Sequence, residues 1–186
     1  DFALGRDRTG TLQSLELLGR SMGFSVETIP PFVVGGQVVS STSIREALSK
    51  GDLDTANQFL GRRFSLTGTV TSTSRRGASL GFPTANLDVD SGRALPCDGV
   101  YVTIAHVSGK QLASVTNIGR RPTFGGTERV VETYILDFRG SLYGETLSVE
   151  FAVRLRDETP FPDREHLVAQ IERDVAAARR ILGANE

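Results

Sequence analysis

The sequence predicts a mainly β protein: a small closed barrel followed by a C-terminal helix and preceded by an incomplete α/β region. Three observations support this fold class. From Phe64 onwards, apolar residues recur at every second position in several short runs that glycine and proline separate. The end of the chain instead has helical spacing, and residues 1–61 mix helical and strand patterns. Several short strands favour a barrel, because closure leaves no unpaired edge.

The first part of the α/β region alternates between the two patterns. Apolar residues at helical spacing predict a helix over Leu12–Met22, and the alternation that follows predicts a short strand over Phe24–Ile29. Two short β-type runs, Phe32–Val34 and Val38–Val39, flank the pair Gly35-Gly36.

Two further helices are expected before the barrel. The four residues Ser43–Glu46 form a capping-box pattern, which predicts a helix from there to about Ser49. Asp52 can cap a second helix that runs to Leu60, and Gly61 ends it.

The clearest strand of the barrel region runs from Leu147 to Leu155, where apolar residues alternate with polar or small ones. A closing helix is predicted over Arg164–Leu182, with Asp163 as its cap and Gly183 as its stop. Further strand candidates are residues 64–72, 99–107, 112–118 and 130–138.

Composition excludes several classes of protein. The formal net charge of -1 gives no basic field for nucleic acid, and no apolar run is long enough to span a membrane. Cys97 is the only cysteine and there are two histidines, which argues against a disulfide framework and a structural zinc site. A cytoplasmic location is expected. The chain begins at Asp1 without a signal-peptide pattern, which is consistent with a fragment of a longer protein.

The segment Arg75–Asn86, RRGASLGFPTAN, has the features of a nucleotide loop. Gly77 and Gly81 allow backbone amides to approach a phosphate chain closely. Thr84 offers a hydroxyl of the kind that ligates Mg²⁺, and Asn86 faces the same way if the segment is extended. From these residues alone, a glycine-rich hairpin without a ligand is an equally good interpretation.

Glu132 is the second candidate. The even positions from Val130 to Phe138 are otherwise apolar or aromatic, so a carboxylate shares a strand face with them. Burial without compensation is costly for such a group. The alternative, a solvated Glu132 at the mouth of the barrel, is equally consistent with the pattern.

The order of motifs resembles the riboflavin kinase family. The matching segments cover roughly Phe64 to the C-terminus: LGFPTANL (80–87), GVYV (99–102), NIGRRPTF (117–124), VETYILDF (131–138), LYGE (142–145) and LRDE (155–158). Upstream, DFALGRDRTG (1–10) and VSSTSIREAL (39–48) resemble the end of the adenylyltransferase half of the bifunctional bacterial riboflavin kinase/FAD synthetase.

The resemblance implies a six-stranded Greek-key barrel with a C-terminal helix in residues 62–186, after a remnant of an FMN adenylyltransferase domain in residues 1–61. It also implies transfer of phosphate from ATP to riboflavin, giving ADP and FMN, with Mg²⁺ as cofactor. Glu132 would be the base. The other implied roles are ATP binding by Gly77, Gly81, Thr84, Asn86, Ile135 and Tyr143, with Thr84 and Asn86 at the metal. Flavin binding is implied for Asn117, Arg156 and Phe161, the last two on a mobile flap. An adenylyltransferase remnant is implied at Ser40, Ser41, Thr42 and Arg45.

The sequence departs from the family at two points. Ala78 stands where a Lys or Arg is frequent in the glycine loop, so Arg75 or Arg76 would have to substitute. Thr159 and Pro160 follow the LRDE motif, where a Lys is frequent.

Two alternative functions remain at this point. An enzyme that also makes FAD needs an HxGH-like motif, and neither His106 nor His166 lies in one. A barrel that binds a flavin or an oligonucleotide without chemistry is the other. The balanced charge and the lack of a basic-aromatic stripe argue against nucleic acid, and Glu132 with the Thr84/Asn86 pair favours catalysis.

Overall fold

The computed structural model of the chain describes residues 7, 10–71, 80–123 and 126–183. It divides into two compact units, Asp1–Val33 and Val34–Glu186. In the first unit, helix α1 (Leu12–Met22) has the predicted bounds: Thr11 and Ser14 form a capping box at its start, and Gly23 ends it with a φ of 78°.

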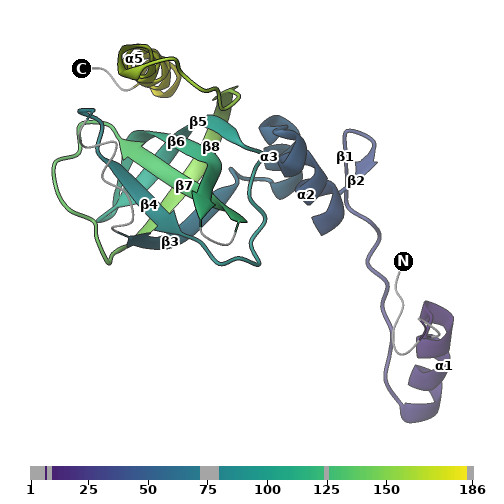
Figure 1. Cartoon of the computed structure of the whole chain (residues 1–186). Coiled ribbons are helices and arrows are strands. Elements are labelled where there is room, and N and C mark those ends of the chain that lie inside the picture. The colour runs from purple at the N-terminus through teal and green to yellow at the C-terminus, as the bar shows by residue number, and fades with distance from the viewer. Residues whose placement is uncertain (1–6, 8–9, 72–79, 124–125, 184–186) are drawn as a thin grey trace. The chain divides into compact units, whose positions relative to one another are not determined.

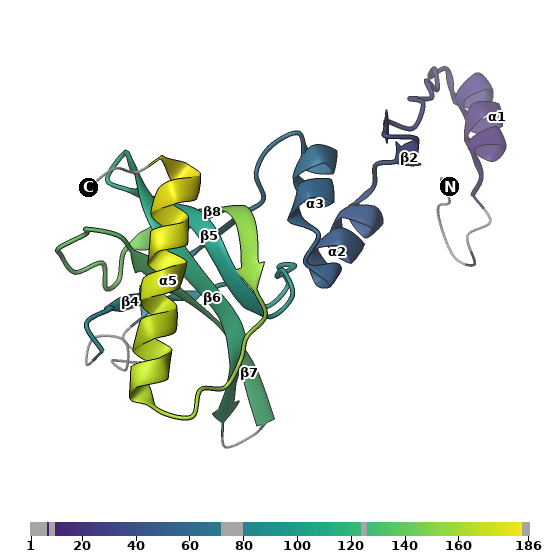
Figure 2. The ribbon, with the colours of Figure 1, turned by 90° about the horizontal axis from the view of Figure 1, so that it is seen from above.

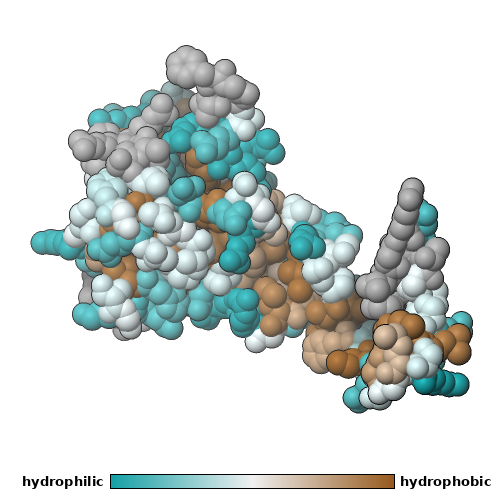
Figure 3. Space-filling model, turned by 90° about the horizontal axis from the view of Figure 1, so that it is seen from below, coloured by the Kyte–Doolittle hydropathy of each residue, from teal (hydrophilic) through white to brown (hydrophobic). Residues whose placement is uncertain are grey.

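The predicted strand over Phe24–Ile29 is wrong. These residues have no regular structure, and Ile29 is 88% exposed. A strand needs the hydrogen bonds of a neighbouring strand, and none of the described residues pairs with this segment. Hydrophobic surface is visible on this unit in Figure 3. Leu17 and Met22 of α1 are among its exposed large apolar residues.

A small hairpin and two helices precede the barrel. Strands β1 (Val33–Val34) and β2 (Gln37–Val38) pair through Gly35-Gly36, whose positive φ angles of 58° and 78° suit a tight hairpin turn. Helix α3 (Leu53–Leu60) has the predicted cap, Asp52, and the predicted stop, Gly61.

Helix α2 (Ser41–Lys50) begins earlier than the capping-box pattern at Ser43–Glu46 predicts. Its cap is Ser40, whose hydroxyl accepts a hydrogen bond from the Ser43 amide at 3.1 Å, while the Ser43 hydroxyl accepts one from the Ser40 amide at 2.9 Å. The serine expected to be the cap is therefore the third residue of the helix, because two serines satisfy the first turn reciprocally.

Six antiparallel strands form a closed barrel in the order β3-β4-β7-β6-β5-β8 (Figure 1). Strands β5, β6 and β7 are consecutive, and β4, which precedes them in the chain, lies beside β7, which makes a Greek key. The predicted six-stranded Greek-key barrel is confirmed. Its strands are β3 (Ser65–Thr71), β4 (Thr84–Asp88), β5 (Gly99–Val107), β6 (Lys110–Thr123), β7 (Gly126–Ile135) and β8 (Thr146–Arg156).

Two strand predictions need correction. Strand β4 is not among the strand candidates, since its five residues follow Pro83 directly and their exposure does not alternate. Strand β7 ends at Ile135, so Leu136 and Phe138 do not continue the strand face of Glu132. The chain turns at Asp137, which has a φ of 58°.

The protein has a core on each side of the barrel wall. The interior is filled by large side chains such as Leu66, Tyr101 and Phe151, and the same cluster includes Leu48 and Leu53 from α2 and α3. Four buried hydroxyls also lie inside and form a chain of hydrogen bonds of 2.7–2.9 Å: Ser114, Thr103, Thr116 and Thr133.

Helix α5 (Arg164–Leu182) forms the second core on the outside of the barrel. It has the predicted bounds, with Asp163 as cap and Gly183 as stop. Figure 2 shows it crossing the outer face of β5 and β6. Ala178 belongs to the same buried cluster as Val102 and Val115. Among the described residues, no helix is long and apolar enough to cross a membrane.

Candidate active site

A row of side chains crosses all six strands on the outside of the barrel. Glu132 on β7 is paired with Asn86 on β4 and with Asn117 on β6. Directly paired residues project to the same face of a sheet. Since Val131 and Thr133 are buried in the barrel, Glu132 and its row face outward. In barrel order the row is Thr71, Asn86, Glu132, Asn117, Val100 and Arg156.

A cavity of about 390 Å³ lies over the last four members of this row, from Glu132 to Arg156. Its floor includes Glu132, Asn117 and Arg156, and its roof comes from α5 and from the loop that leads into it. The structure therefore brings the predicted flavin residues together with the predicted base. The remaining lining is largely apolar and includes Phe82, Val115, Tyr134, Phe161, Leu167 and Ile171.

A second cavity, of about 130 Å³, gathers predicted nucleotide residues. Thr84, Ile135 and Tyr143 line it together with Pro83 and Phe138. Thr84 also lines the larger cavity, so this one residue belongs to the wall of both. A nucleotide in the small cavity and an acceptor in the large one would meet beside Thr84.

Asn86 is 5% exposed, and neither atom of its amide group has a hydrogen-bond partner among the described residues. It lines a third, polar cavity of about 280 Å³ that Arg121 and Arg129 also line. An unsatisfied buried amide is costly, so its oxygen is suited to a ligand such as a metal ion. Gly81 is described, with a φ of 88°, whereas Gly77 and Ala78 lie outside the described residues.

Arg156 joins the barrel to α5. Its guanidinium donates hydrogen bonds of 2.8–3.2 Å to both carboxylate oxygens of Asp174, which is 5% exposed. Arg156 also donates to Thr159 and lies 5.7 Å from the ring centre of Phe161. Fork-shaped pairing of this kind fixes the plane of the guanidinium.

Asp174 is a site residue that the sequence analysis misses. A signal for it exists, because Asp174 lies three residues after Ile171 and four before Ala178, on the apolar face of α5. A carboxylate at such a position requires a buried partner, and Arg156 supplies it.

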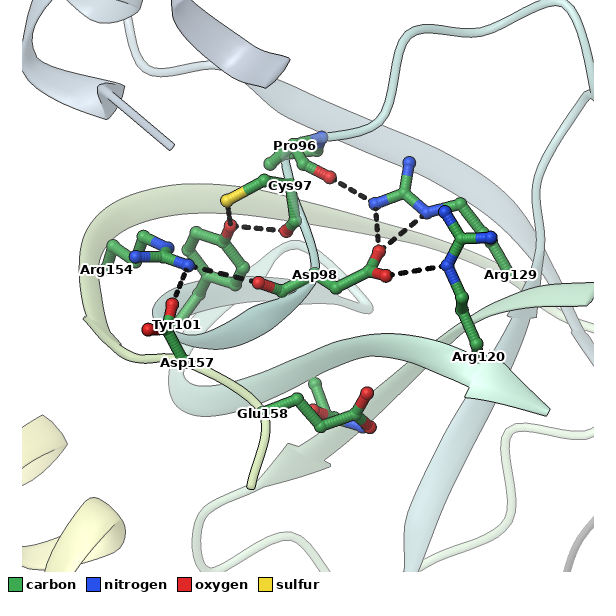
Figure 4. Close-up of polar contacts among 10 residues, drawn as sticks. Pro96, Cys97, Asp98, Tyr101, Arg120, Arg129, Arg154, Asp157 and Glu158 are labelled. Atoms are coloured by element: carbon green, nitrogen blue, oxygen red, sulfur yellow. Dashed lines mark hydrogen bonds and ion pairs between the residues drawn. The ribbon is translucent and has the colours of Figure 1, made fainter. Parts of the chain in front are cut away.

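A polar cluster supports the end of β8 (Figure 4). The carboxylate of Asp98 accepts hydrogen bonds from Arg120 at 3.0 Å and from Arg129 at 2.8 Å. Arg154 donates to the backbone oxygen of Asp98 and to the carboxylate of Asp157. Nearby, burial raises the pKa of the Tyr101 phenol, which stays protonated and donates to the Cys97 carbonyl at 2.6 Å.

The predicted adenylyltransferase residues lie together at the start of α2. Ser40 is engaged in the cap with Ser43, and Ser41, Thr42 and Arg45 are exposed. None of them lines the two cavities that meet at Thr84.

The family model "Riboflavin kinase" (Flavokinase) matches residues 60–182, which include all six barrel strands and α5. The chain belongs to the riboflavin kinase family. The chain is 37% identical over 180 residues to the bifunctional riboflavin kinase/FMN adenylyltransferase of Haemophilus influenzae, covering 96% of this chain and 58% of that protein. It is 40% identical to the protein of the same name from Pseudomonas fluorescens, covering 97% and 58%.

A solved structure titled macrolide-efflux protein, from Streptococcus pneumoniae, superimposes with a TM-score of 0.83 at 32% identity, covering 96% of this chain and 58% of that one. The chain thus spans somewhat more than half the length of these relatives. The outward row, the two cavities and the roof formed by α5 all lie within the matched segment.

Proposed function

We propose that this chain transfers the γ-phosphoryl group of ATP to the ribityl 5′-hydroxyl of riboflavin, giving ADP and FMN. The observation that carries the proposal is the position of Thr84 in the wall shared by two cavities, the larger of which also contains Glu132. Phosphoryl transfer requires a donor and an acceptor held in line, with a carboxylate beside the acceptor hydroxyl.

Glu132 acts as the general base. Its carboxylate accepts the proton of the 5′-hydroxyl as that oxygen attacks the γ-phosphorus, and the bond to the bridging oxygen of ADP breaks. Proton removal by a positioned side chain accelerates such steps by ~10²–10⁴-fold. Its register partners on the neighbouring strands are Asn86 and Asn117.

The two substrates divide the site between them. The flavin occupies the larger cavity, where Asn117, Arg156 and Phe161 contact it. The nucleotide occupies the smaller cavity beside Ile135 and Tyr143, with its phosphates toward Gly81. The apolar roof excludes water, which reduces the competing hydrolysis of ATP.

Mg²⁺ is the proposed metal, and Thr84 and Asn86 would hold it. Bound with ATP, it would neutralise charge on the phosphates. The buried amide of Asn86 suits this role. The described residues contain no group of three or more metal-binding side chains of His, Cys, Asp or Glu. A metal bound through one or two protein oxygens plus phosphates and waters is typical of Mg²⁺.

We assign kinase activity to residues 62–186 and an adenylyltransferase origin to residues 1–61, with Ser40, Ser41, Thr42 and Arg45 as phosphate contacts. The relatives from Haemophilus influenzae and Pseudomonas fluorescens are named as bifunctional enzymes. We propose that the protein to which this sequence belongs also converts FMN to FAD.

The test compares the purified chain with Glu132→Gln, given riboflavin, ATP and Mg²⁺. We expect FMN and ADP from the first and a turnover lower by ~10²–10⁴-fold from the second, with riboflavin binding nearly unchanged. The amide keeps the shape of the side chain but cannot accept the proton. Binding of riboflavin without FMN formation by the unaltered chain would favour the non-catalytic barrel, and wild-type turnover by Glu132→Gln would remove Glu132 as the base.

A further inference from the structure

Residues 157–163 leave β8, border the larger cavity and enter α5. Side chains fix the first part of this loop at successive positions. Asp157 pairs with Arg154, and Thr159 accepts a hydrogen bond from Arg156. Between them, Glu158 accepts a hydrogen bond of 3.3 Å from the side-chain amide of Asn117. Figure 4 shows Asp157 pointing toward Arg154 and Glu158 pointing away from that ion pair.

The carboxylate of Glu158 also fills the space that a side chain on Gly119 would need. A Cβ atom added to Gly119 would lie 2.7 Å from the Glu158 carboxyl carbon and 2.9 Å from one of its oxygens. Gly119 does not have a positive φ, so its backbone does not itself require glycine. The three atoms nearest to that added Cβ all belong to Glu158.

We propose that Glu158 is a positioning residue that holds the 157–163 loop over the acceptor cavity by seating its carboxylate against Gly119 and the amide of Asn117. This inference rests on the proposed riboflavin kinase function and adds a specific latch to it. Asn117 is paired in register with Glu132, so the latch joins the loop to the row that carries the base.

The latch makes a distinct kinetic prediction. If the loop is closed in only part of the population, the apparent affinity for the acceptor equals the intrinsic affinity multiplied by the closed fraction. The hydrogen bond is exposed, which limits its strength. We therefore expect Glu158→Ala to raise the KM for riboflavin by ~3–10-fold. The effect on kcat should be smaller, because the groups at the reacting atoms remain.

Gly119→Ala should give the same change, since the methyl group displaces the carboxylate. The double variant Gly119→Ala/Glu158→Ala should be no worse than Glu158→Ala alone, because the methyl group then meets no carboxylate. Independent effects would instead multiply. Matched controls are Gly92→Ala, where an added Cβ meets nothing closer than 3.4 Å, and Glu172→Ala, an exposed carboxylate on α5.

Two measurements decide the matter. Riboflavin affinity is taken from steady-state KM and from flavin fluorescence with Mg²⁺-ADP present. Hydrogen exchange of residues 157–163 is measured in the free protein and should be faster in Glu158→Ala than in Glu172→Ala. A wild-type KM and wild-type exchange in Glu158→Ala, or multiplying effects in the double variant, would overturn the latch. An unaltered chain that neither binds nor phosphorylates riboflavin would instead refute the proposed function, while the exchange result would still report on the latch.

Discussion

Thr84 is the one candidate site residue that lines both the smaller and the larger of the two substrate cavities among the described residues. Thr84 is paired in register with Tyr134 on the neighbouring strand β7, and this pairing fixes its place in the sheet. The β-branched shape suits this extended backbone, whereas the hydroxyl group is not required by it. Shape and chemistry at this position can therefore be separated by substitution.

Thr84→Val should lower activity with Mg²⁺-ATP by about 10–100-fold, the loss expected when one contact to a charged group is removed. Thermal stability should change little, because valine keeps the shape of the side chain. Thr69→Val, at an exposed position on β3, is the control. Kinetics and a melting curve are recorded for both variants. A strongly lowered Tm with Thr84→Val would assign the residue to structure instead.

Sequence patterns single out Glu132 as a candidate but do not single out Asp174, although both line the larger cavity. Both are carboxylates among apolar neighbours, but alternation along a strand makes Glu132 visible, whereas Asp174 needs its partner Arg156 to be known. That partner lies 18 positions away on another element. The tertiary structure brings such distant residues together, and the spacing of residues within one helix or strand does not predict these contacts.

Helix α5 both covers the outside of the barrel and forms a wall of the acceptor cavity. Its ends are predicted correctly because Asp163 and Gly183 mark them chemically. Strand β4 is missed because five residues after a proline carry no period. Residues Phe24–Ile29 show the opposite error: their apolar residues alternate, but they form no strand because no described strand pairs with them.

Asp174→Asn should destabilise the protein by ~1–3 kcal/mol, since the amide cannot accept both hydrogen bonds and leaves the Arg156 charge poorly compensated. Urea unfolding at neutral pH measures the change. Glu172→Gln, on the exposed side of the same helix, should behave like the unaltered chain. Equal urea midpoints for the two variants would mean that the pair with Arg156 does not anchor α5.

The cap of α3 predicts a pH dependence. Hydrogen bonds from Thr55 hold the pKa of Asp52 below its ordinary value of 3.8. A carboxylate with a lowered pKa contributes stability above its unfolded pKa and loses it as the pH falls through the folded value. Asparagine caps as well as aspartate but does not titrate. Asp52→Asn should therefore match the unaltered chain at pH 7 and become relatively more stable below about pH 4.

Urea midpoints of both chains, taken at intervals between neutral and acid pH, check this expectation. All other carboxylates are common to the two proteins and cancel in the difference. Parallel curves over the whole range would show that the Asp52 carboxylate contributes nothing as a cap.

For the molecule as a whole, the two histidines lie in the barrel half, where the Nε2 of His106 is 3.0 Å from a carboxylate oxygen of Glu150 and the Nδ1 of His166 is 2.8 Å from one of Asp163. Neither lies near the predicted adenylyltransferase residues in the sequence. We therefore expect this chain to convert riboflavin to FMN but to form no FAD from FMN, ATP and Mg²⁺. Chromatography of the two reactions decides it, and FAD in the second reaction would show a working adenylyltransferase site within these residues.

The row from Thr71 to Arg156 also determines which changes of chain length the site can tolerate. Extra residues at the Ser108-Gly109 turn would leave every pairing of the row in place. One residue inserted within β7 before Glu132 would exchange its two faces and send the carboxylate into the barrel interior. Since each strand is bonded on both sides, no edge strand can slide to absorb the shift. Engineering of acceptor preference in this scaffold should therefore vary the lengths of turns and leave strand lengths constant.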